Sequence, residues 1–477
     1  MVLSSVSQAV SSVSCDSFDQ RVSSASDSPS DSAGRRREDG LAIFRAAVAA
    51  VDPFALVQAN LRLEDDTLVV GPHTFHLTSV ARIVVVGAGK ATPAMARACE
   101  GILGDRIHAG SINTKHDHAV PLERISTIEC AHPIPDESGV AGAREILHLL
   151  SGLTEHDVVL CLLSGGGSAL MPVPAPGITL QDKGLTTGAL LACGATIHEI
   201  NTIRKHLSAI KGGWLAMRAM PARVVSMMVS DVIDDPIDII ASGPTAPDPT
   251  TFADGLDILD LYGITQAIPT TVLLHLEAGA AGQVPETPKS GDAAFDRTRN
   301  LVVGNNCLAL AAARSEAERR GYQPLVLSSR IAGETRHVAA MHVAIAREVA
   351  TTSQPISAPA CLISGGETTV TLRGDGKGGR NQEFALAAAL DLDGCEGITV
   401  LSCGTDGTDG PTDAAGAIAD GSSVSRAAAV GLGASQYLAR NNSYRFFQAL
   451  DDLVITGPTG TNVMDLRLLL VGKGTEP

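Results

Sequence analysis

Short apolar runs that end in glycine-rich or acidic turns recur along this chain and are its strongest constraint on the fold. In the first half they occupy Arg82–Val86, Asp157–Leu163 and Val224–Val229, and helical patterns lie between them. Runs without alternating polar residues favour strands that are covered on both faces, as in parallel sheets with helical crossovers. The sequence therefore predicts an α/β protein with a mainly parallel sheet, whose ligands gather at the carboxyl ends of the strands.

Changes in composition divide the 477 residues, which are too many for one ordinary core. Residues 1–40 are Ser-rich, with few large apolar residues and a run of three arginines, so we expect them to be disordered. Residues 41–280 carry the first α/β pattern and form the expected N-terminal domain. The stretch 281–296, rich in Gly, Pro and charged residues, is typical of a linker. The pattern then restarts, so residues 281–477 form the expected C-terminal α/β region.

Composition excludes several classes of partner. The formal net charge is −16 and only 3% of residues are aromatic, which argues against a nucleic-acid partner. Nine cysteines occur without a C-x-x-C pair, several of them inside apolar runs, as in reduced intracellular proteins. No apolar run approaches the roughly 18 residues that span a bilayer. We expect a cytoplasmic protein without membrane contact, and the sequence leaves a homo-oligomer open.

Two glycine-rich loops follow the first two predicted strands and suit anions. The loop Gly87–Thr92 fits neither the dinucleotide fingerprint, because its sixth residue is Thr, nor the Walker loop, because the four-residue spacer is absent. It nevertheless holds Lys90 at the start of a predicted helix, where amides and the helix dipole favour anions. The loop Ser164–Ser168 contains three consecutive glycines that let amides approach a phosphate or carboxylate. A tight structural turn remains the alternative for both loops.

Charged groups cluster at further positions. The stretch Asn201–His206, followed by Lys211, gathers basic side chains on an acidic protein, although surface charge on a helix is the default explanation for such a cluster. Asp231 directly follows a predicted strand, as do Asp406 and Asp409, and oxygen ligands on loops suit Mg²⁺. Helix capping is the alternative for some of these acids.

Two more loops complete the pattern. Gly376–Glu383 delivers Arg380 and Asn381 into a predicted helix start, where an arginine can bind a carboxylate or phosphate with two hydrogen bonds. Gly457–Asn462 is a Gly/Thr loop after another apolar run. So many loops at strand ends favour one shared ligand site.

Together these strings resemble the glycerate 2-kinase family, whose C-terminal part is called the MOFRL domain. The resemblance extends from about residue 41 to 472 and keeps the family's order of motifs. Its most specific strings are Gly87–Ala91, Ala131–Asp136, Leu163–Leu170, Ile203–Gly213, Ile240–Thr245, Gly365–Val370 and Gly378–Glu383.

The resemblance implies a three-layer N-terminal α/β domain and a smaller C-terminal α/β domain, with MOFRL at about 360–472 and the active site in the cleft between them. It further implies transfer of the ATP γ-phosphate to D-glycerate, giving 2-phosphoglycerate and ADP. The family's active-site lysine falls on Lys90, its arginine on Arg380, and its acids on Asp231, Asp406 and Asp409. The chain departs from the family pattern at four positions, namely Asp117, Asp234, Asn442 and Met464.

From these residues we expect a division of labour typical of phosphoryl transfer, which needs positioning and charge neutralisation. Lys90 and Arg380, with Asp231 and Asp406, are the expected catalytic set. Asp231, Asp406 and Asp409 are the expected ligands of Mg²⁺, and Asp406 is preferred over Asp409 as the base. The glycerate site is expected at Arg204, Arg380, Asn381 and Glu383. The nucleotide is expected at Gly87, Gly89, Ser164, Gly165, Gly166, Gly167, Ser168, Thr459 and Asn462.

Three alternatives stay open at this level. A hydroxypyruvate reductase would bind a similar three-carbon acid, but it needs a nicotinamide site that the loop ending in Thr92 does not offer. A kinase of another small hydroxy acid would use the same loops. A sensor of small anions would explain the glycines but not the acids at the strand ends.

Overall fold

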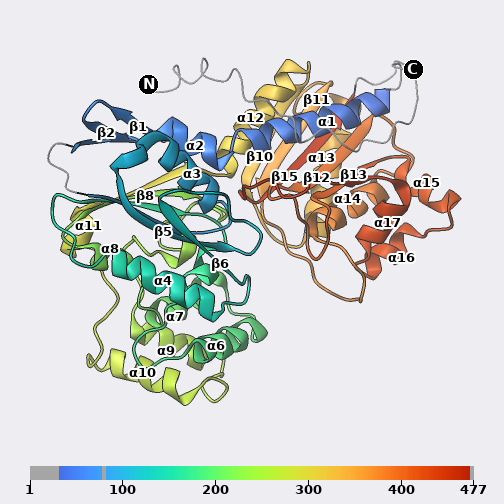
Figure 1. Ribbon diagram of the computed structural model, residues 1–477. Coiled ribbons are helices and arrows are strands. Elements are labelled where there is room, and N and C mark those ends of the chain that lie inside the picture. The colour runs from blue at the N-terminus through green and yellow to red at the C-terminus, as the bar shows by residue number, and fades with distance from the viewer. Residues whose placement is uncertain (1–31, 78–81, 473–477) are drawn as a thin grey trace.

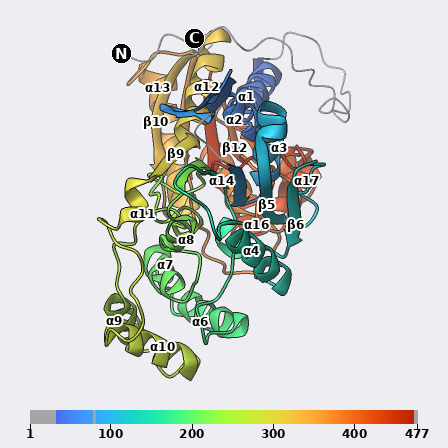
Figure 2. The same ribbon diagram turned by 60° about the vertical axis from the view of Figure 1, so that its left-hand side comes forward.

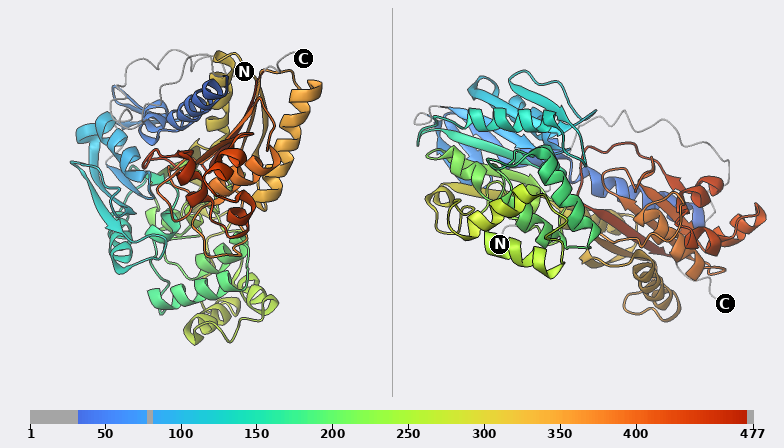
Figure 3. Two further views of the ribbon diagram at one scale, coloured as in Figure 1. Left: turned by 90° about the vertical axis from the view of Figure 1, so that its right-hand side faces the viewer. Right: turned by 90° about the horizontal axis from the view of Figure 1, so that it is seen from below.

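The computed structural model describes residues 32–77 and 82–472 and contains two α/β units, side by side in Figure 3. A six-stranded sheet forms the first unit, with strand order β6-β5-β4-β7-β8-β9 and every neighbouring pair parallel. Its strands are β4 (Ile83–Ala88), β5 (Ile107–Lys115), β6 (Ile125–Cys130), β7 (Val158–Leu163), β8 (Arg223–Val229) and β9 (Thr298–Gly304). The predicted parallel sheet is confirmed, and the predicted strands lie within one or two residues of β4, β7 and β8.

Helices cover both faces of this sheet, because alternate strand residues point to opposite sides. Val85 and Leu162 point to a cluster that includes α2 (Pro53–Asn60) and α3 (Thr92–Leu103). Val84 and Cys161 point to a second cluster with α4 (Glu137–Leu149) and α8 (Trp214–Ala219). A small antiparallel sheet of β1 (Leu61–Glu64), β2 (Thr67–Val70) and β3 (His73–His76) adds its apolar residues to the first cluster. The three-layer arrangement is visible in Figure 1.

A helical lobe extends from the first unit on the side away from the second, as Figure 2 shows. It consists of α6 (Leu180–Ala192), α7 (Ile197–His206), α9 (Phe252–Leu261) and α10 (Thr270–Ala280) around their own apolar cluster. Helices α6, α7 and α9 each begin with a capping box, in which a threonine and the acid three residues later satisfy one another's backbone amides. The lobe is therefore built from locally encoded helices.

The second unit contains a mixed six-stranded sheet with order β10-β11-β15-β12-β13-β14. Only β10 and β11 pair in parallel. The strands are β10 (Gln323–Ile331), β11 (Ala360–Gly366), β12 (Ile398–Gly404), β13 (Gly416–Asp420), β14 (Leu453–Val454) and β15 (Asp465–Val471). One face packs on α1 (Ser32–Ala49) and α12 (Asn306–Arg319), the other on α13 (Thr335–Thr352) and α14 (Arg380–Asp391).

Helices α5 (Gly167–Leu170) and α11 (Ala293–Asp296) complete the described helices of the first unit, whereas α15 (Ser423–Ala429), α16 (Ala434–Ala439) and α17 (Ser443–Leu450) pack around a small cluster in the second.

No single helix in the described part of the chain is long and apolar enough to cross a membrane, although α1 and α2, bent by 46° at their junction, satisfy the length and composition criteria as a pair.

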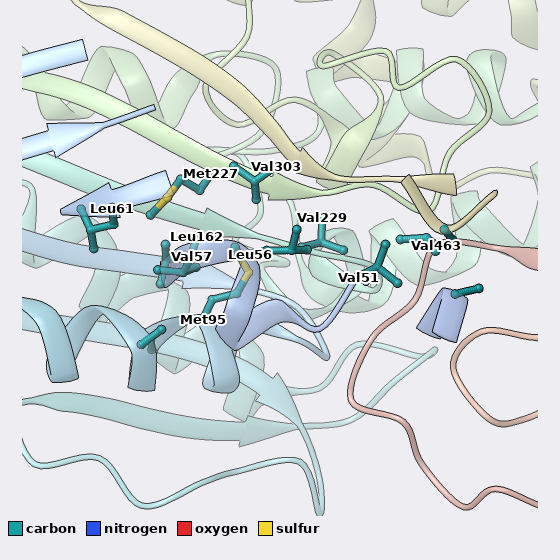
Figure 4. Packing of buried hydrophobic residues seen from close by; sticks show 14 of the residues in the cluster. Val51, Leu56, Val57, Leu61, Met95, Leu162, Met227, Val229, Val303 and Val463 are labelled. Carbon is teal, nitrogen blue, oxygen red and sulfur yellow. The ribbon is translucent and has the colours of Figure 1, made fainter. Parts of the chain in front are cut away.

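One apolar core continues from the first unit into the second. Val229 and Val303 of the parallel sheet belong to the same cluster as Val51, which follows α1, and Val463, which precedes β15 (Figure 4). The cluster extends further to Ile363 and its neighbours in the second sheet. This shared core fixes the carboxyl ends of the first sheet beside the loops of the second.

The expectation of disorder up to residue 40 is wrong for residues 32–40, which begin α1. Arg36 donates to Thr399 Oγ1 at 3.2 Å, and Arg37 bridges Asp420 at 2.7 Å and Asp452 at 2.5 Å. The arginine run looked like a solvated tail because these partners lie more than 360 residues away. Residues 1–31 lie outside the described part of the chain.

The expected domain boundary at residue 280 also differs from the sheet topology. Strand β9 pairs in parallel with β8, so the first sheet continues to Gly304. The stretch 281–296 is anchored to the helical lobe, since Glu286 accepts a hydrogen bond from His206 at 2.8 Å and Thr287 is buried. The stretch looked like a linker because its composition is polar. Its place in the first unit depends on the pairing of β9 with β8, which local composition does not reveal.

We predict that Arg37→Met destabilises the protein by about 3 kcal/mol, because it leaves the buried carboxylates of Asp420 and Asp452 short of a partner. The matched control is Arg314→Met, whose ion pair with Glu318 on α12 is exposed and contributes at most about 0.5 kcal/mol. Urea unfolding followed by circular dichroism compares the two midpoints. Equal midpoints for both variants would show that α1 does not depend on these bridges.

Candidate active site

The strand order of the first sheet reverses between β4 and β7, and the two glycine loops lie at that point. Lys90 N donates to Gly165 O at 3.0 Å, and Ala91 N donates to Ser164 Oγ at 3.0 Å. In open parallel sheets, ligands bind in the crevice outside the carboxyl ends of strands at such a reversal. The two loops predicted separately are therefore one structure at the expected ligand position.

Close packing explains two of the glycines. A Cβ atom on Gly87 would lie 2.0 Å from Leu162 O, and one on Gly89, whose φ is +148°, would lie 2.0 Å from Ser164 Oγ. At both positions a side chain would push β4 and β7 apart, which accounts for the glycines without a ligand.

Loops of the second unit meet this point from the opposite side. Lys90 Nζ lies 3.8 Å from Asp406 Oδ2, and Asn462 Nδ2 donates to Asp231 Oδ2 at 3.4 Å. A Cβ on Gly165 would lie only 2.3 Å from Asp231 Oδ2. The structure therefore brings together Lys90, Asp231, Asp406 and Asn462, which the sequence predicts for one site.

Arg380 is held in this region by two acids. Its Nε donates to Asp465 Oδ2 at 2.7 Å, and its terminal nitrogen lies 2.8 Å from Glu367 Oε1. Asp465 is fully buried and also accepts from Arg467 and Asn381. Asp465 and Glu367 had no predicted role, although the acid and arginine at alternate positions of the apolar strand β15 were a signal in the sequence.

Three predicted site residues have internal partners instead. Asp409 accepts from the amides of Asn381 at 3.0 Å and Gln382 at 2.8 Å, so it caps α14. Asn381 also contacts Asp465 and Ser402, and Glu383 pairs with Arg336 at 2.6 Å and accepts from Asn441. These buried side chains orient Arg380 through the framework of α14, and their positions do not support the predicted contacts with metal or substrate.

Burial and neighbouring charges perturb the acids of the site. Burial raises the pKa of Asp231, an effect that Lys90 opposes and Asp406 increases. The pKa of Glu367 is raised by loss of water contact, and by Asp465, Asp231 and Asp406, while Arg380 lowers it. Burial similarly raises the pKa of Asp409 to about 6. Carboxylates of both units therefore repel one another across the site, and a cation would relieve that repulsion.

The acids also determine how a metal could be held. The described residues contain no group of three or more His, Cys, Asp or Glu side chains arranged to hold a metal ion. Mg²⁺ usually takes only one or two protein carboxylates and completes its shell with water and phosphate oxygens. Asp231 and Asp406 fit that requirement, whereas both oxygens of Asp409 are already engaged by backbone amides.

His132, within the Ala131–Asp136 string, also lies at the site, although the sequence predicted no role for it. A Cβ on Gly166 would lie 3.1 Å from its imidazole and 3.6 Å from Lys90 Cγ. Burial lowers the pKa of His132 to about 4, and the charge of Lys90 adds to this effect. A neutral imidazole therefore lies beside Lys90 at neutral pH.

The departures from the family pattern have local explanations. Asp117 and Asp234, where the family usually has Gly, adopt φ of +64° and +68°, as expected for Asp in a left-handed turn. Met464 also has a positive φ, +71°, and acts through its backbone, since its carbonyl accepts from Thr405 Oγ1 at 2.6 Å. Asn442 accepts from Lys377 N at 3.1 Å.

Thr459 supports the Asp406 loop, whereas Arg204 lies among other basic side chains. Thr459 Oγ1 donates to Thr405 O at 2.6 Å and its amide donates to Asp406 O, so it supports the Asp406 loop. Arg204, on α7, interacts electrostatically with Lys183 and Lys211. Lys211 reaches Ser168 O, which connects this basic group to the end of the second glycine loop.

Fold and site together define a two-domain α/β protein with a basic, amide-rich loop at a sheet reversal that faces acids of a second domain. Residues 39–277 match a family model described as a domain of unknown function, DUF4147, and residues 360–465 match the MOFRL family. The second match begins where the MOFRL domain was expected.

Known proteins agree with both matches. The chain is 41% identical to a glycerate 2-kinase of Pyrococcus horikoshii over 91% of this chain and 97% of that protein. It is 43% identical to an Agrobacterium vitis protein provisionally named a hydroxypyruvate reductase, over 90% of this chain and 93% of that protein. The crystal structure of a Thermotoga maritima glycerate kinase superposes with a TM-score of 0.81 at 39% identity, covering 92% of this chain and all of that one. The chain belongs to the glycerate 2-kinase family with a C-terminal MOFRL domain.

We predict that Lys90→Met raises the pKa of His132 above about 4, because a nearby positive charge no longer opposes protonation of the imidazole. The value stays below the ordinary 6.5, since burial is the largest cause of the shift. NMR titration of labelled histidines measures it. His342 is the internal control, because burial also holds its pKa near 4 but Lys90 makes no contribution there. An unchanged His132 would show that Lys90 lies elsewhere in solution.

Proposed function

We propose that this protein transfers the γ-phosphate of ATP to the 2-hydroxyl of D-glycerate, giving 2-phosphoglycerate and ADP. One observation carries the proposal, namely Lys90 at the sheet reversal with its Nζ 3.8 Å from Asp406 of the second domain. A phosphate group between the two domains would meet a cation and amides on one side and metal-binding acids on the other. The names of the Pyrococcus and Thermotoga relatives support glycerate as the acceptor.

The loop residues bind the phosphates in this mechanism. Lys90 and the amides of Gly165, Gly166 and Ser168 hold phosphate oxygens, because a cation and oriented N–H groups neutralise the charge on the transferring group. The amides of Ser164 and Gly167 donate to Ala88 O and Ser164 O and hold the loop in shape. Gly165 lets Asp231 approach this loop, since a Cβ there would lie 2.3 Å from Asp231 Oδ2. Asn462 and Thr459 act indirectly, Asn462 through its bond to Asp231 and Thr459 through the Asp406 loop.

Asp231 and Asp406, both half-buried, divide the remaining tasks. Asp231 lies against Gly165, beside the phosphate loop, so we assign it to Mg²⁺, which supplies charge neutralisation on the phosphate oxygens when bound. Asp406 accepts the proton of the 2-hydroxyl as that oxygen forms its bond to the γ-phosphorus and the bond to the β-phosphate oxygen breaks. Its Oδ1 accepts from Thr408, which leaves Oδ2 on the side of Lys90.

Hydroxypyruvate reduction is the alternative, since the strand order is that of dinucleotide-binding sheets and the Agrobacterium relative carries that provisional name. Thr92 opposes it, because its buried hydroxyl contacts Ser164 Oγ at 3.3 Å where the fingerprint requires Gly or Ala. Hydride transfer also has no use for Asp231 and Asp406. Oxidation of NADH or NADPH by hydroxypyruvate tests this candidate, and a panel of small hydroxy acids tests other acceptors.

A cytoplasmic location belongs to the same proposal. The eight described cysteines are all free and most are buried, as expected in a reducing compartment.

Lys90→Met is expected to lower kcat for glycerate-dependent ADP release about 100-fold or more, because the variant loses a fixed positive charge at the transferring phosphate. A coupled ADP assay with D-glycerate, ATP and Mg²⁺ measures it. Lys115→Met, which removes a nearby lysine outside the loop contacts, is the matched control and should retain most of the activity. A Lys90 variant with near wild-type kcat would contradict the proposed mechanism.

Asp231→Asn is expected to raise the Mg²⁺ concentration required for half-maximal activity at saturating ATP, because one negatively charged ligand is lost. The comparison is Asp409→Asn, which removes a helix cap and should lower thermal stability without changing the Mg²⁺ requirement. If Asp409→Asn raised the Mg²⁺ requirement and Asp231→Asn did not, the metal would be assigned to Asp409.

A further inference from the structure

Three basic side chains lie together beyond the second glycine loop and have no acidic partner in the described part of the chain. They are Lys183 on α6, Arg204 on α7 and Lys211 after α7, which we call the basic triad. Lys183 is 8% exposed and Lys211 is 2% exposed. Lys183 Nζ donates to Pro172 O at 3.1 Å, and Lys211 Nζ donates to Met171 O at 2.8 Å and Ser168 O at 2.5 Å. Among the described residues, none forms an ion pair with the triad.

Neighbouring cations on the same helix show that the fold can supply acids. Lys205, next to Arg204, is buried between Asp238 at 3.0 Å and Asp248 at 3.3 Å. His206 contacts Glu286 at 2.8 Å. Buried charges are usually paired, because desolvation without a partner is costly. The basic triad therefore differs from the neighbouring cations of the same segment, which have acidic partners.

The three cations also repel one another. Burial lowers the pKa of Lys183 to about 7, and the charge of Arg204 lowers it further in the same direction. Burial lowers the pKa of Lys211 well below its ordinary value, with Lys183 and Arg204 adding to the effect. An anion placed among them would reverse this electrostatic cost.

Polar contacts connect the triad to the phosphate loop. Ser168 Oγ lies 2.7 Å from Ser242 Oγ, which donates to Asn201 Oδ1 at 3.0 Å, and Asn201 lies one turn before Arg204 on α7. Ala241 and Ser242 both have positive φ, +51° and +61°. Such strained backbone persists only where surrounding contacts enforce it and is concentrated at functional sites.

We infer that Lys183, Arg204 and Lys211 form the subsite that binds the carboxylate of the acceptor, with the guanidinium of Arg204 as its main contact. The inference rests on the proposed function and deepens it. Arg380, the other arginine expected to bind glycerate, already pairs with Asp465 and Glu367. Among the described residues the planar guanidinium of Arg204 has no acidic partner, and a bound carboxylate would favour the charged form of the two lysines.

Steady-state kinetics of Arg204→Met test the subsite. We expect the KM for D-glycerate to rise about 10-fold to 100-fold, as for loss of a charged hydrogen-bonding group, while the KM for ATP changes less than about twofold. Arg204→Lys should restore part of the loss, because it returns the charge without the fork. Arg218→Met, on the adjacent α8, removes an exposed arginine and serves as the matched control.

The kinetic outcomes distinguish failure of the carboxylate subsite from failure of the proposed kinase function. An active wild-type enzyme with an unchanged KM for D-glycerate in Arg204→Met would overturn the subsite and leave the kinase function intact. A wild-type protein without glycerate-dependent ADP release would overturn the proposed function, and the glycerate subsite with it.

Thermal unfolding provides an independent readout. Because the triad has no acidic partner to leave behind, Arg204→Met and Lys183→Met should have melting temperatures equal to or above that of the wild type. Lys205→Met should melt lower, since it leaves Asp238 and Asp248 unpaired. An Arg204 variant that melts as low as the Lys205 variant would show that Arg204 serves the fold, which contradicts the inference.

Discussion

The apolar core shared by the two sheets is the constraint on which the rest of this structure depends. Val229 and Val303 of the parallel sheet pack in one cluster with Val463, and through it with the second sheet. Val463 lies beside Asn462, the partner of Asp231. The packing that joins the domains therefore also sets the distance between the phosphate loop and the acids that face it. A change in this core would alter the site without touching any charged residue.

The site contains acidic and basic side chains whose charges the folded protein does not neutralise by itself. Burial and neighbouring acids raise the pKa of Asp231 and Glu367, and burial and neighbouring cations lower the pKa of Lys211. Elsewhere the fold pairs its buried charges, as at Lys205, which contacts Asp238 and Asp248. Unbalanced charge of both signs at one place fits a protein that brings a metal–nucleotide complex to a small anionic acceptor.

The sequence predicted the parts of the site that follow apolar strands. Lys90 and Asp231 follow β4 and β8, whose carboxyl ends meet at one edge of the parallel sheet. Asp406 follows β12 of the second sheet, whose apolar run is equally recognisable. Side chains whose roles depend on distant partners were not predictable. Asp409 had the same local signal as Asp406, but the amides of α14 use both of its oxygens. Similarly, Arg37 lies in α1 and binds an acid far along the chain, a contact that its local sequence does not reveal. Strand β9 belongs to the first sheet because it pairs with β8.

The most direct test of the account is identification of the phosphorylated product. Wild-type protein is incubated with D-glycerate, ATP and Mg²⁺, and ³¹P NMR follows the phosphate signals against authentic standards. The account predicts 2-phosphoglycerate formed in equal amount with ADP. Formation of 3-phosphoglycerate would contradict the proposed position of transfer, and ADP formation independent of glycerate, or no turnover, would contradict the acceptor.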